Sequence, residues 1–380
     1  MKILAYTDLT ISPNNLFWYR DLGLLTKAFR QSGHDAWLVV HPAAGAASKV
    51  MSGSDGSPVL WARAREVRDP TWWRNQKPDL AILGLWTRPK YDPVRRAALS
   101  ATRRVIERAD SDGVRTASCG LRTYAQRRYD YFRDRTCRWP AFLSIPASAL
   151  YGSASILATP WIESRLARTL QVLPAVMVET PHATKCWQDL ATRMGADPNR
   201  IHCVPHPIQT DIFFSKPEIH KKDQIISVGR WESYQKDLPR LLRALKSFLQ
   251  QNPEWSALVV GSGLLAVPQH ERIRFLPPLP SRELAHHMRE SKIFFSSSRY
   301  ESFGLAAAEA KACGCLLVSP SGCWLHDDLC RQEKGEDLTS ALRRAGRMQV
   351  QVSPSPSTSA FSPAAVVDKI LCVAGKIQNH

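Results

Sequence analysis

The sequence lacks any long hydrophobic run, since no stretch of about 18 or more apolar residues occurs in it. A membrane-spanning helix is therefore not expected. The first residues, 1–5, run into polar residues without a charged leader and an apolar core, so we expect no secretion signal either. With 380 residues, of which 44% are hydrophobic, the chain fits two globular domains. These features together predict a soluble, cytoplasmic protein.

Cysteine is present but has no recognisable pattern. The nine cysteines are scattered and odd in number, which argues against a disulfide framework and fits a reducing compartment. Cys313, Cys315, Cys323 and Cys330, together with His326, are a conceivable metal site. They lack the paired two-residue spacings that are typical of zinc sites. We therefore expect structural thiols and no bound metal.

Acidic residues are few relative to basic ones, 34 against 51, which gives a formal charge of +17. This charge predicts an anionic partner, and a phosphorylated substrate, an anionic membrane surface or nucleic acid would each satisfy it. Tyrosines and arginines interleave in residues 122–139, which would suit stacking on bases or contact with a membrane interface. A basic helix with inward-packed aromatic residues is the commoner explanation. No zinc-finger or aromatic RNA-binding motif occurs, so nucleic acid is the least expected partner.

Strand and helix patterns alternate along the whole chain. Apolar runs that predict strands occur at residues 2–6, 36–40, 79–85, 155–158 and 175–178, and a second series occurs at 224–229, 256–263, 273–276, 293–295 and 315–318. This alternation predicts parallel sheets with right-handed crossovers. We expect an α/β fold with two doubly wound, Rossmann-like domains facing a cleft, and ligands at the carboxyl ends of the strands.

Breaks in the pattern set the expected domain boundaries. Residues 1–207 form the first domain, 208–222 a linker and 223–350 the second domain. Residues 351–362 are rich in serine and proline and are expected to be a connector. Residues 363–380 are expected to form a terminal helix that returns to the first domain.

Residues 300–310 (YESFGLAAAEA) place two carboxylates around a glycine at the expected start of a helix. A helix that begins near Phe303 or Gly304 presents free backbone amides and the positive end of its dipole, which together stabilise a phosphate. Glu301 lies just outside this helix and Glu309 about one and a half turns inside it. The segment therefore predicts a nucleotide-sugar cradle. The alternative is two solvent-facing carboxylates without a ligand.

Several short motifs resemble the carboxyl-terminal domain of glycosyltransferase family 4 in order and spacing. They are residues 228–230 (VGR), 236–237 (KD), 259–263 (VVGSG), 274–277 (RFLP) and 298–314. The resemblance covers residues 225–318 and, more loosely, 178–213. It implies the GT-B fold and transfer of a sugar from a nucleotide diphosphate sugar, with retention, to a glycan, a lipid-linked or another hydroxyl acceptor.

The resemblance also implies roles for single residues. Arg230 and Lys236 would hold the donor diphosphate and, with Glu301 on the donor sugar, form the catalytic group. The remaining donor contacts would come from Phe303, Gly304, Leu305, Glu309, Gly229 and Gly261. The donor is expected to carry uridine or guanosine, and no metal is expected because two cations and a helix start can neutralise the diphosphate. We expect Glu301 and Glu309 on one wall of the cleft and Arg230 and Lys236 opposite.

The chain departs from this family on the acceptor side. Asn14 and Asn15 stand where the family usually has a glycine pair, and a histidine often found after a middle strand is not evident near residues 116–120. Asn14, Asn15 and Arg122 are the candidate acceptor-side residues, and the basic region could bind a lipid-linked acceptor or the inner face of an anionic membrane. Two alternatives stay open. One is a non-catalytic GT-B-like protein that binds polyanions or nucleic acid, and the other is a GT-B epimerase or phosphorylase.

Overall fold

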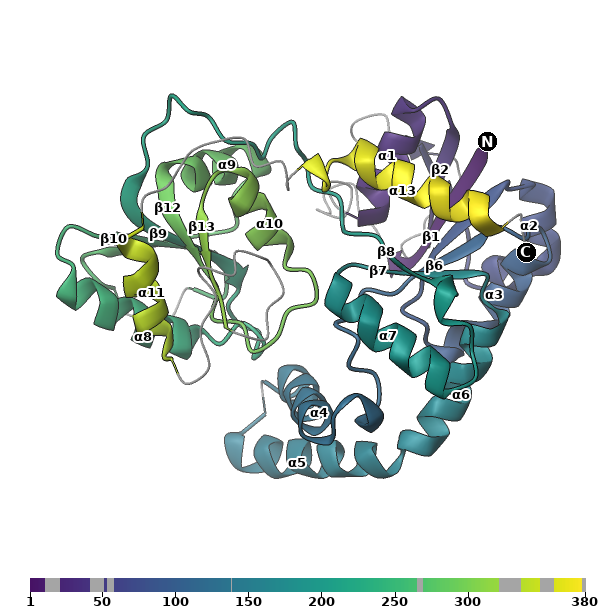
Figure 1. The fold of residues 1–380 in the computed structure, drawn as a ribbon, viewed down its shortest axis with the longest axis horizontal. Helices are drawn as coiled ribbons and strands as arrows, with labels where there is room; N and C mark the ends of the chain where they lie inside the picture. The colour runs from purple at the N-terminus through teal and green to yellow at the C-terminus, as the bar shows by residue number, and fades with distance from the viewer. Residues whose placement is uncertain are drawn as a thin grey trace. The chain divides into compact units, whose positions relative to one another are not determined.

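The structure is a computed structural model that describes residues 1–10, 21–41, 51–52, 58–137, 139–264, 269–320, 336–348 and 359–377. The chain divides into two compact units, drawn in Figure 1. Unit 1 comprises Met1–Leu121, Leu157–Gln209 and Ala360–His380. Unit 2 comprises Arg122–Ile156 and Thr210–Ser359. Each unit is built around its own sheet.

The sheet of unit 1 has the strand order β3-β4-β2-β1-β5-β6-β7-β8. Its strands are β1 (Lys2–Thr10), β2 (Asp35–His41), β3 (Met51–Ser52), β4 (Pro58–Trp61), β5 (Leu80–Gly84), β6 (Val105–Arg108), β7 (Ala175–Val178) and β8 (Ile201–Cys203). All neighbouring strands pair in parallel except β3 and β4. The central strands β5, β6 and β7 are buried throughout, as expected for a sheet covered on both faces.

Helices cover both faces of this sheet. They are α1 (Asp21–Gln31), α2 (Pro70–Gln76), α3 (Asp92–Leu99), α6 (Thr159–Val172), α7 (Pro181–Arg193) and α13 (Pro363–Lys376), with short 3-10 turns at Glu66–Arg68, Pro89–Tyr91, Ala117–Cys119 and Pro198–Arg200. Alternate residues of β1 enter different clusters: Leu4 packs with α2, α3, α6 and α7, whereas Ile3 packs with α1 and α13. The last helix therefore completes the core of unit 1.

The sheet of unit 2 is parallel throughout, with the order β11-β10-β9-β12-β13. Its strands are β9 (Lys222–Arg230), β10 (Ser256–Ser262), β11 (Ile273–Leu276), β12 (Ser291–Phe295) and β13 (Leu316–Val318), and its helices after residue 209 are α8 (Leu238–Gln251), α9 (Ser281–Glu290), α10 (Leu305–Ala312) and α11 (Leu338–Gly346). Phe248 of α8 and Leu342 of α11 belong to one buried cluster with Val259 and Phe295 of the sheet. The predicted class, two parallel α/β domains, is confirmed.

The division differs from the predicted boundaries between residues 122 and 156. These residues form α4 (Leu121–Arg135) and α5 (Ala141–Leu157), which pack in unit 2 although the sequence assigned them to the first domain, 1–207. The predicted strand at 155–158 was wrong, because these residues close α5 and lead into α6. Most of the predicted connector 351–362 lies outside the described residues.

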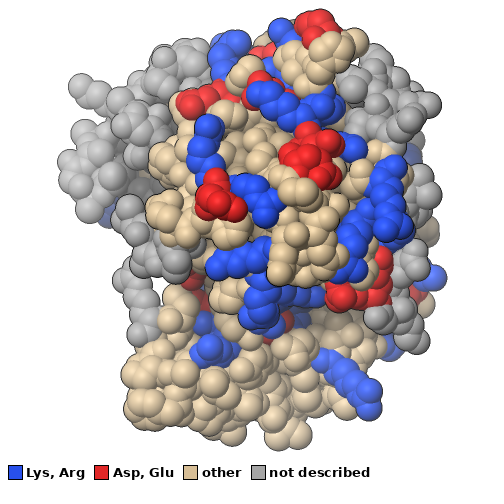
Figure 2. All heavy atoms as spheres, turned by 90° about the vertical axis from the view of Figure 1, so that its left-hand side faces the viewer, with Lys and Arg blue, Asp and Glu red and all other residues tan. Residues whose placement is uncertain are grey.

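Charge is unevenly spread over the surface. Figure 2 shows Lys and Arg side chains over much of the face that it draws, whereas its lowest part is mostly uncharged. The lowest part of the view corresponds to α5, which carries no charged residue, whereas the arginine-rich α4 lies above it in Figure 1.

Candidate functional site

Two loops at the carboxyl edge of the unit 2 sheet carry the predicted catalytic residues. One loop follows β9 and holds Lys236, and the other follows β12 and holds Glu301. The Lys236 amine and the Glu301 carboxylate form an ion pair, and their side chains are 21% and 17% exposed. The Ser298 hydroxyl also donates a hydrogen bond to Glu301 Oε1 at 2.9 Å. Glu301 is therefore held in place by two neighbours before any ligand binds.

This arrangement differs from the prediction that Lys236 stands opposite Glu301. Strands β9 and β12 are neighbours in the sheet, although two strands and two helices separate them in the sequence. The loops that follow neighbouring parallel strands meet at the same edge of the sheet, so the two side chains lie next to each other. The sequence does not reveal this strand order.

Further hydrogen bonds and an ion pair connect the same two loops. The Ser297 hydroxyl donates to the carbonyl oxygen of Lys236 at 2.7 Å, and the amide of Arg299 donates to the carbonyl oxygen of Gln235 at 2.8 Å. The Arg299 guanidinium pairs with the Asp237 carboxylate at 2.8 Å. Asp237 is also the N-cap of α8, where its carboxylate accepts a hydrogen bond from the Arg240 amide at 3.3 Å. These bonds fix the relative position of Lys236 and Glu301.

Gly229 and Gly261, both predicted to contact the donor, face each other in the β9–β10 pair. Gly261 has φ 141°, and a Cβ added to it would lie 1.8 Å from the carbonyl oxygen of Gly229. The indole of Trp231 covers this position and donates a hydrogen bond to the carbonyl oxygen of Val260 at 2.9 Å. Close backbone approach thus requires glycine at residue 261 even without a ligand. Its contact with a donor stays a prediction.

Helix α10 begins as the sequence pattern indicated. Gly304, with φ 73°, is its N-cap and offers no side-chain acceptor to the first-turn amides. Phe303 is buried, whereas Leu305 and Glu309 are half-buried. A helix start that is not capped by a side chain is a suitable place for a phosphate oxygen. Glu309 lies in the second turn and has contacts of its own.

Two further predicted site residues are described: Arg230 precedes the loop that holds Lys236, and Arg122 lies on α4. Arg230 ends β9 with an exposed side chain, and no carboxylate within the described ranges pairs with it. It is thus a cation available to an anionic ligand. Arg122 is exposed in the first turn of α4. Asn14 and Asn15 lie outside the described residues.

Helix α4 contacts the two loops that hold Lys236 and Glu301. The Asp134 carboxylate accepts a hydrogen bond from the Ser233 hydroxyl at 2.6 Å. The Arg133 guanidinium lies 5.1 Å from the centre of the Tyr234 ring, and that of Arg127 lies 4.1 Å from the centre of the Tyr300 ring. The interleaved arginines and tyrosines of this segment, considered in the sequence for bases or lipid, include residues that stack on side chains of unit 2.

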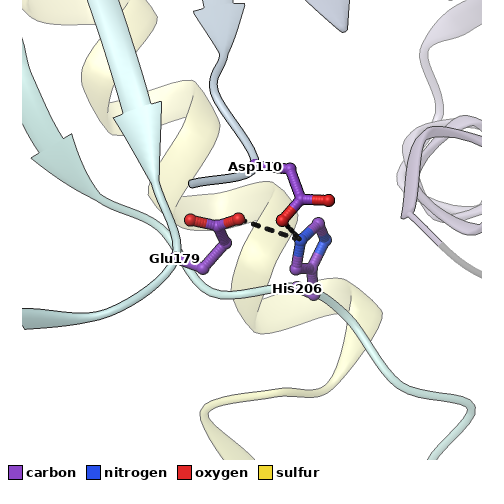
Figure 3. A group of neighbouring side chains, drawn as sticks. All are labelled: Asp110, Glu179 and His206. Atoms are coloured by element: carbon purple, nitrogen blue, oxygen red, sulfur yellow. Dashed lines mark ion pairs between the residues drawn. The ribbon is translucent and has the colours of Figure 1, made fainter. Parts of the chain in front are cut away.

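Unit 1 contains a second cluster, which the sequence did not reveal (Figure 3). Asp110 follows β6, Glu179 follows β7 and His206 follows β8, and one ligand atom from each lies within 4.8 Å of the others. His206 Nε2 lies 3.4 Å from Glu179 Oε1 and 3.9 Å from Asp110 Oδ1. Its Nδ1 lies 3.0 Å from Asp21 Oδ1, which also pairs with Arg108 Nε at 2.6 Å.

Burial determines the protonation of this cluster. Loss of solvent raises the pKa of the Glu179 carboxyl to about 8, against the lowering effect of the hydrogen bond with His206. Burial and Arg108 act to lower the pKa of His206, but Asp21 and Asp110 raise it well above the ordinary value. Near neutral pH the cluster therefore holds a protonated imidazole and a protonated Glu179. In these protonation states His206 and Glu179 can bind a hydroxyl or donate a proton, and coordination of a divalent cation would require both groups to lose their protons.

These three residues were missed because they are far apart in the sequence and carry no shared motif. The available signal is positional. Each follows a strand of the parallel sheet, at the edge where such sheets bind ligands. To use this signal, one must know that β6 and β8 are the neighbours of β7 in the sheet. The composition of the sequence does not reveal this strand order.

Two of the four cysteines considered as metal ligands, Cys313 and Cys315, are among the described residues. Cys313 and Cys315 are buried, and Cys315 Sγ donates to the carbonyl oxygen of Met288 at 3.0 Å. Burial raises the pKa of Cys313 to about 12, which keeps the thiol protonated. These two buried residues pack as core thiols of unit 2. Cys323, His326 and Cys330 lie outside the described residues.

The segment that holds Lys236 and Glu301 matches a known family model. Residues 208–332 match the family model described as Glycosyl transferases group 1. A D-inositol 3-phosphate glycosyltransferase of Xylanimonas cellulosilytica is 30% identical over 157 residues, which are 35% of this chain and 37% of the relative. The chain thus matches little more than a third of the length of this curated relative.

Solved structures are similar over the whole chain. Anabaena HepE, in complex with UDP and glucose, has a TM-score of 0.58 at 13% identity and covers 100% of this chain and 98% of its own. The α,α-trehalose 6-phosphate synthase of Burkholderia multivorans has a TM-score of 0.61 at 11% identity, covering 99% and 98%. At these identities the likeness concerns the fold. The two parallel α/β units and these structural neighbours show that the chain has the GT-B fold.

Proposed function

We propose that this protein is a glycosyltransferase that moves a sugar from a uridine or guanosine diphosphate sugar to a hydroxyl acceptor, with retention of anomeric configuration. The observation that carries the proposal is the joined pair of loops at the carboxyl edge of unit 2. They bring Lys236 and Glu301 together in the segment that matches the glycosyltransferase model. The structural neighbour that was solved with UDP and glucose supports a nucleotide-sugar donor.

The chemistry assigned to these residues is electrostatic. The departing nucleoside diphosphate carries negative charge, which Arg230, Lys236 and the start of α10 would neutralise. A phosphate that binds Lys236 competes with Glu301 for the amine. Glu301 then becomes free to accept hydrogen bonds from sugar hydroxyls, and Glu309 is assigned to the ribose. In this proposal the transfer needs no metal, since the protein supplies the cations.

The acceptor is proposed to be a glycan, a lipid-linked sugar or another hydroxyl compound bound by unit 1. The cluster of Asp110, Glu179 and His206 supports this assignment, because its groups can bind a hydroxyl through hydrogen bonds. Arg122, Asn14 and Asn15 stay candidates for the same side. We also keep a cytoplasmic location, peripheral to the inner face of an anionic membrane, as part of the proposal. Nucleic acid is not proposed as a partner.

Donor binding is the first test. Calorimetric titration with a panel of uridine and guanosine diphosphate sugars should find at least one that binds, with slow hydrolysis of the bound donor. Arg230→Ala and Glu309→Ala should each weaken binding about 10-fold or more, because each removes a charge-assisted hydrogen bond. The exposed α9 residues Arg282 and Glu283, replaced by alanine, are matched controls.

Two results would contradict the proposal. A wild-type protein that binds no nucleotide sugar is not a glycosyltransferase of this kind. Salt-dependent binding of polyanions without donor turnover would favour the non-catalytic alternative. Binding that disappears with a chelator would overturn the metal-free mechanism, and an inverted anomeric centre in the product, measured by NMR, would overturn retention.

A further inference from the structure

Helix α5 has the reverse of the polarity expected for a surface helix. None of its 17 residues carries a charge. Its buried positions are small and mostly polar: Ser144, Ser148, Gly152 and Ser155. Its large apolar side chains point outward, with Phe142 75% and Leu150 72% exposed. Leu143, Ile145 and Leu157 are also exposed. We call these five exposed apolar residues the α5 face.

The contacts of α5 explain why its small residues are buried. They lie against α4, and a Cβ added to Gly152 would come within 3.2 Å of the carbonyl oxygen of Ala125. The Arg128 guanidinium donates to the Ser155 hydroxyl at 3.2 Å, and Arg133 donates to the hydroxyl of Ser144. At Gly152 a larger side chain does not fit this interface, whereas Tyr151 of α5 stacks on Phe132 of α4 with ring centroids 4.8 Å apart. Close packing with α4 therefore fixes the outward direction of the α5 face.

We propose that the α5 face lies in the interfacial region of an anionic lipid bilayer, with α4 behind it at the depth of the headgroups. An uncharged helix with large apolar residues on its exposed side is suited to the boundary between headgroups and acyl chains. The arginines that contact α5 from α4 lie roughly one helix diameter, about 10 Å, behind the α5 face. Trp139, 51% exposed, precedes the helix, and tryptophan favours this boundary.

Lipid fits the α5 face better than a protein does. Protein interfaces carry about one hydrogen bond per 100–200 Å². The α5 face offers no side-chain donor or acceptor, and acyl chains require none. The net charge of +17 provides long-range attraction to anionic headgroups. The uncharged lowest part of Figure 2, with Lys and Arg side chains above it, shows the same combination.

The proposed contact is a surface contact and not a crossing. In the described part of the chain no single helix is long and apolar enough to span a bilayer, although the bent pair of α5 and α6 passes by length and composition. Alone, 17 residues of helix extend about 26 Å, less than the roughly 30 Å of a hydrocarbon core. Helix α6 also carries Glu163, Arg165 and Arg168. These charges favour a location at the interface.

Vesicle flotation of the full chain tests the proposal without any sugar donor, so its outcome is independent of the proposed transfer. The protein should float with phosphatidylcholine vesicles that contain phosphatidylglycerol, and much less with phosphatidylcholine alone. Phe142→Ser combined with Leu150→Ser should lower the partition coefficient on the order of 10-fold or more, since two large apolar side chains no longer leave water. Phe214→Ser, which removes an exposed aromatic residue outside α5, is the matched control.

Each other outcome overturns the proposal. Equal flotation of the double variant would mean that charge alone binds the vesicles. Absence of flotation of the wild type would contradict the proposed membrane contact. The wild type and the double variant should show the same cooperative unfolding transition, which demonstrates that both are folded. The α5 face would instead bind a second copy of the chain if three results coincided. The wild type would sediment as a dimer without lipid, the double variant would sediment as a monomer, and the wild type would not float with vesicles. Resistance to extraction with alkaline carbonate would indicate insertion across the bilayer.

Discussion

The guanidinium of Arg127 lies 4.1 Å from the centre of the Tyr300 ring, which joins α4 to the loop that carries Glu301. Tyr300 directly precedes Glu301, and its carbonyl oxygen accepts a hydrogen bond from Gln235 Nε2 at 2.8 Å. A helix from the first half of the sequence thus contacts the segment that is assigned to the donor. This contact links the position of α4 to that of the predicted catalytic carboxylate.

Replacing Tyr300 by leucine should loosen this link. The loss of a cation–π contact should lower the free energy of unfolding by about 0.5–2 kcal/mol, and donor affinity should fall several-fold because Glu301 is less well placed. Denaturant unfolding and calorimetric titration measure the two effects. Tyr131→Leu is the control, since Tyr131 stacks with Arg128 and Arg135 of its own helix. Unchanged donor affinity in Tyr300→Leu would show that the contact with α4 does not influence donor binding.

The pair of Lys236 and Glu301 should show energetic coupling. Lys236→Met leaves a largely buried carboxylate without its cation, and Glu301→Gln leaves a largely buried amine without its anion. Each single variant should lose on the order of 1 kcal/mol of unfolding free energy, and the double variant should lose less than their sum. Strictly additive losses in denaturant unfolding would show that the pair contributes nothing. Donor binding should nevertheless suffer most in the double variant.

Gly261 should not tolerate alanine. The added Cβ would meet the Gly229 carbonyl oxygen at 1.8 Å, so β9 and β10 would have to separate. We expect a loss of about 3 kcal/mol or more, or failure to fold. Gly195→Ala is the control, because Gly195 also has positive φ, 68°, but its added Cβ meets nothing within 4 Å. That variant should lose only about 1–2 kcal/mol in denaturant unfolding. Similar losses in both variants would contradict the close approach.

Stability should fall as pH rises through the neutral range. The folded chain keeps the Glu179 proton up to its pKa of about 8, whereas the unfolded chain releases it near 4.5. The raised pKa of His206 acts in the same direction above 6.5. Each proton contributes a slope on the order of 1.4 kcal/mol per pH unit while only the folded state holds it.

Glu179→Gln should flatten this slope between about pH 5 and pH 8, because it removes the titration of Glu179. Denaturant unfolding across this pH range measures it. The exposed Glu283→Gln is the control and should keep the wild-type slope. A wild-type protein that becomes more stable from pH 5 to pH 8 would contradict the protonation assigned to the cluster.

The sequence predicted the parts of the fold that depend on local pattern. The strands of unit 2 are apolar runs, and β9 and β10 end at or near glycines, so they could be located from residues 224–229 and 256–263. The start of α10 could be predicted from Gly304 and the alanines that follow. The proximity of Lys236 and Glu301 could not, because it depends on the pairing of β9 with β12.

Helix α5 escaped prediction for a different reason. The usual pattern places apolar residues inside, whereas α5 buries serine and glycine and exposes phenylalanine and leucine. Its end, residues 155–158, therefore resembled a short buried strand. The cluster of Asp110, Glu179 and His206 was also hidden, because strand order and not sequence spacing brings it together.

The contact between α4 and α5 has a consequence for where this hairpin is stable. Ser144, Ser148 and Gly152 recur at four-residue intervals, a spacing of small residues by which helices associate inside bilayers. Their association rests on close backbone approach, on hydrogen bonds from arginine and on the stacked rings of Phe132 and Tyr151. Transfer from an aqueous to a lipid environment weakens hydrophobic association but not the backbone approach or these hydrogen bonds. The hairpin can therefore keep one conformation in both environments, without a refolding step at the membrane.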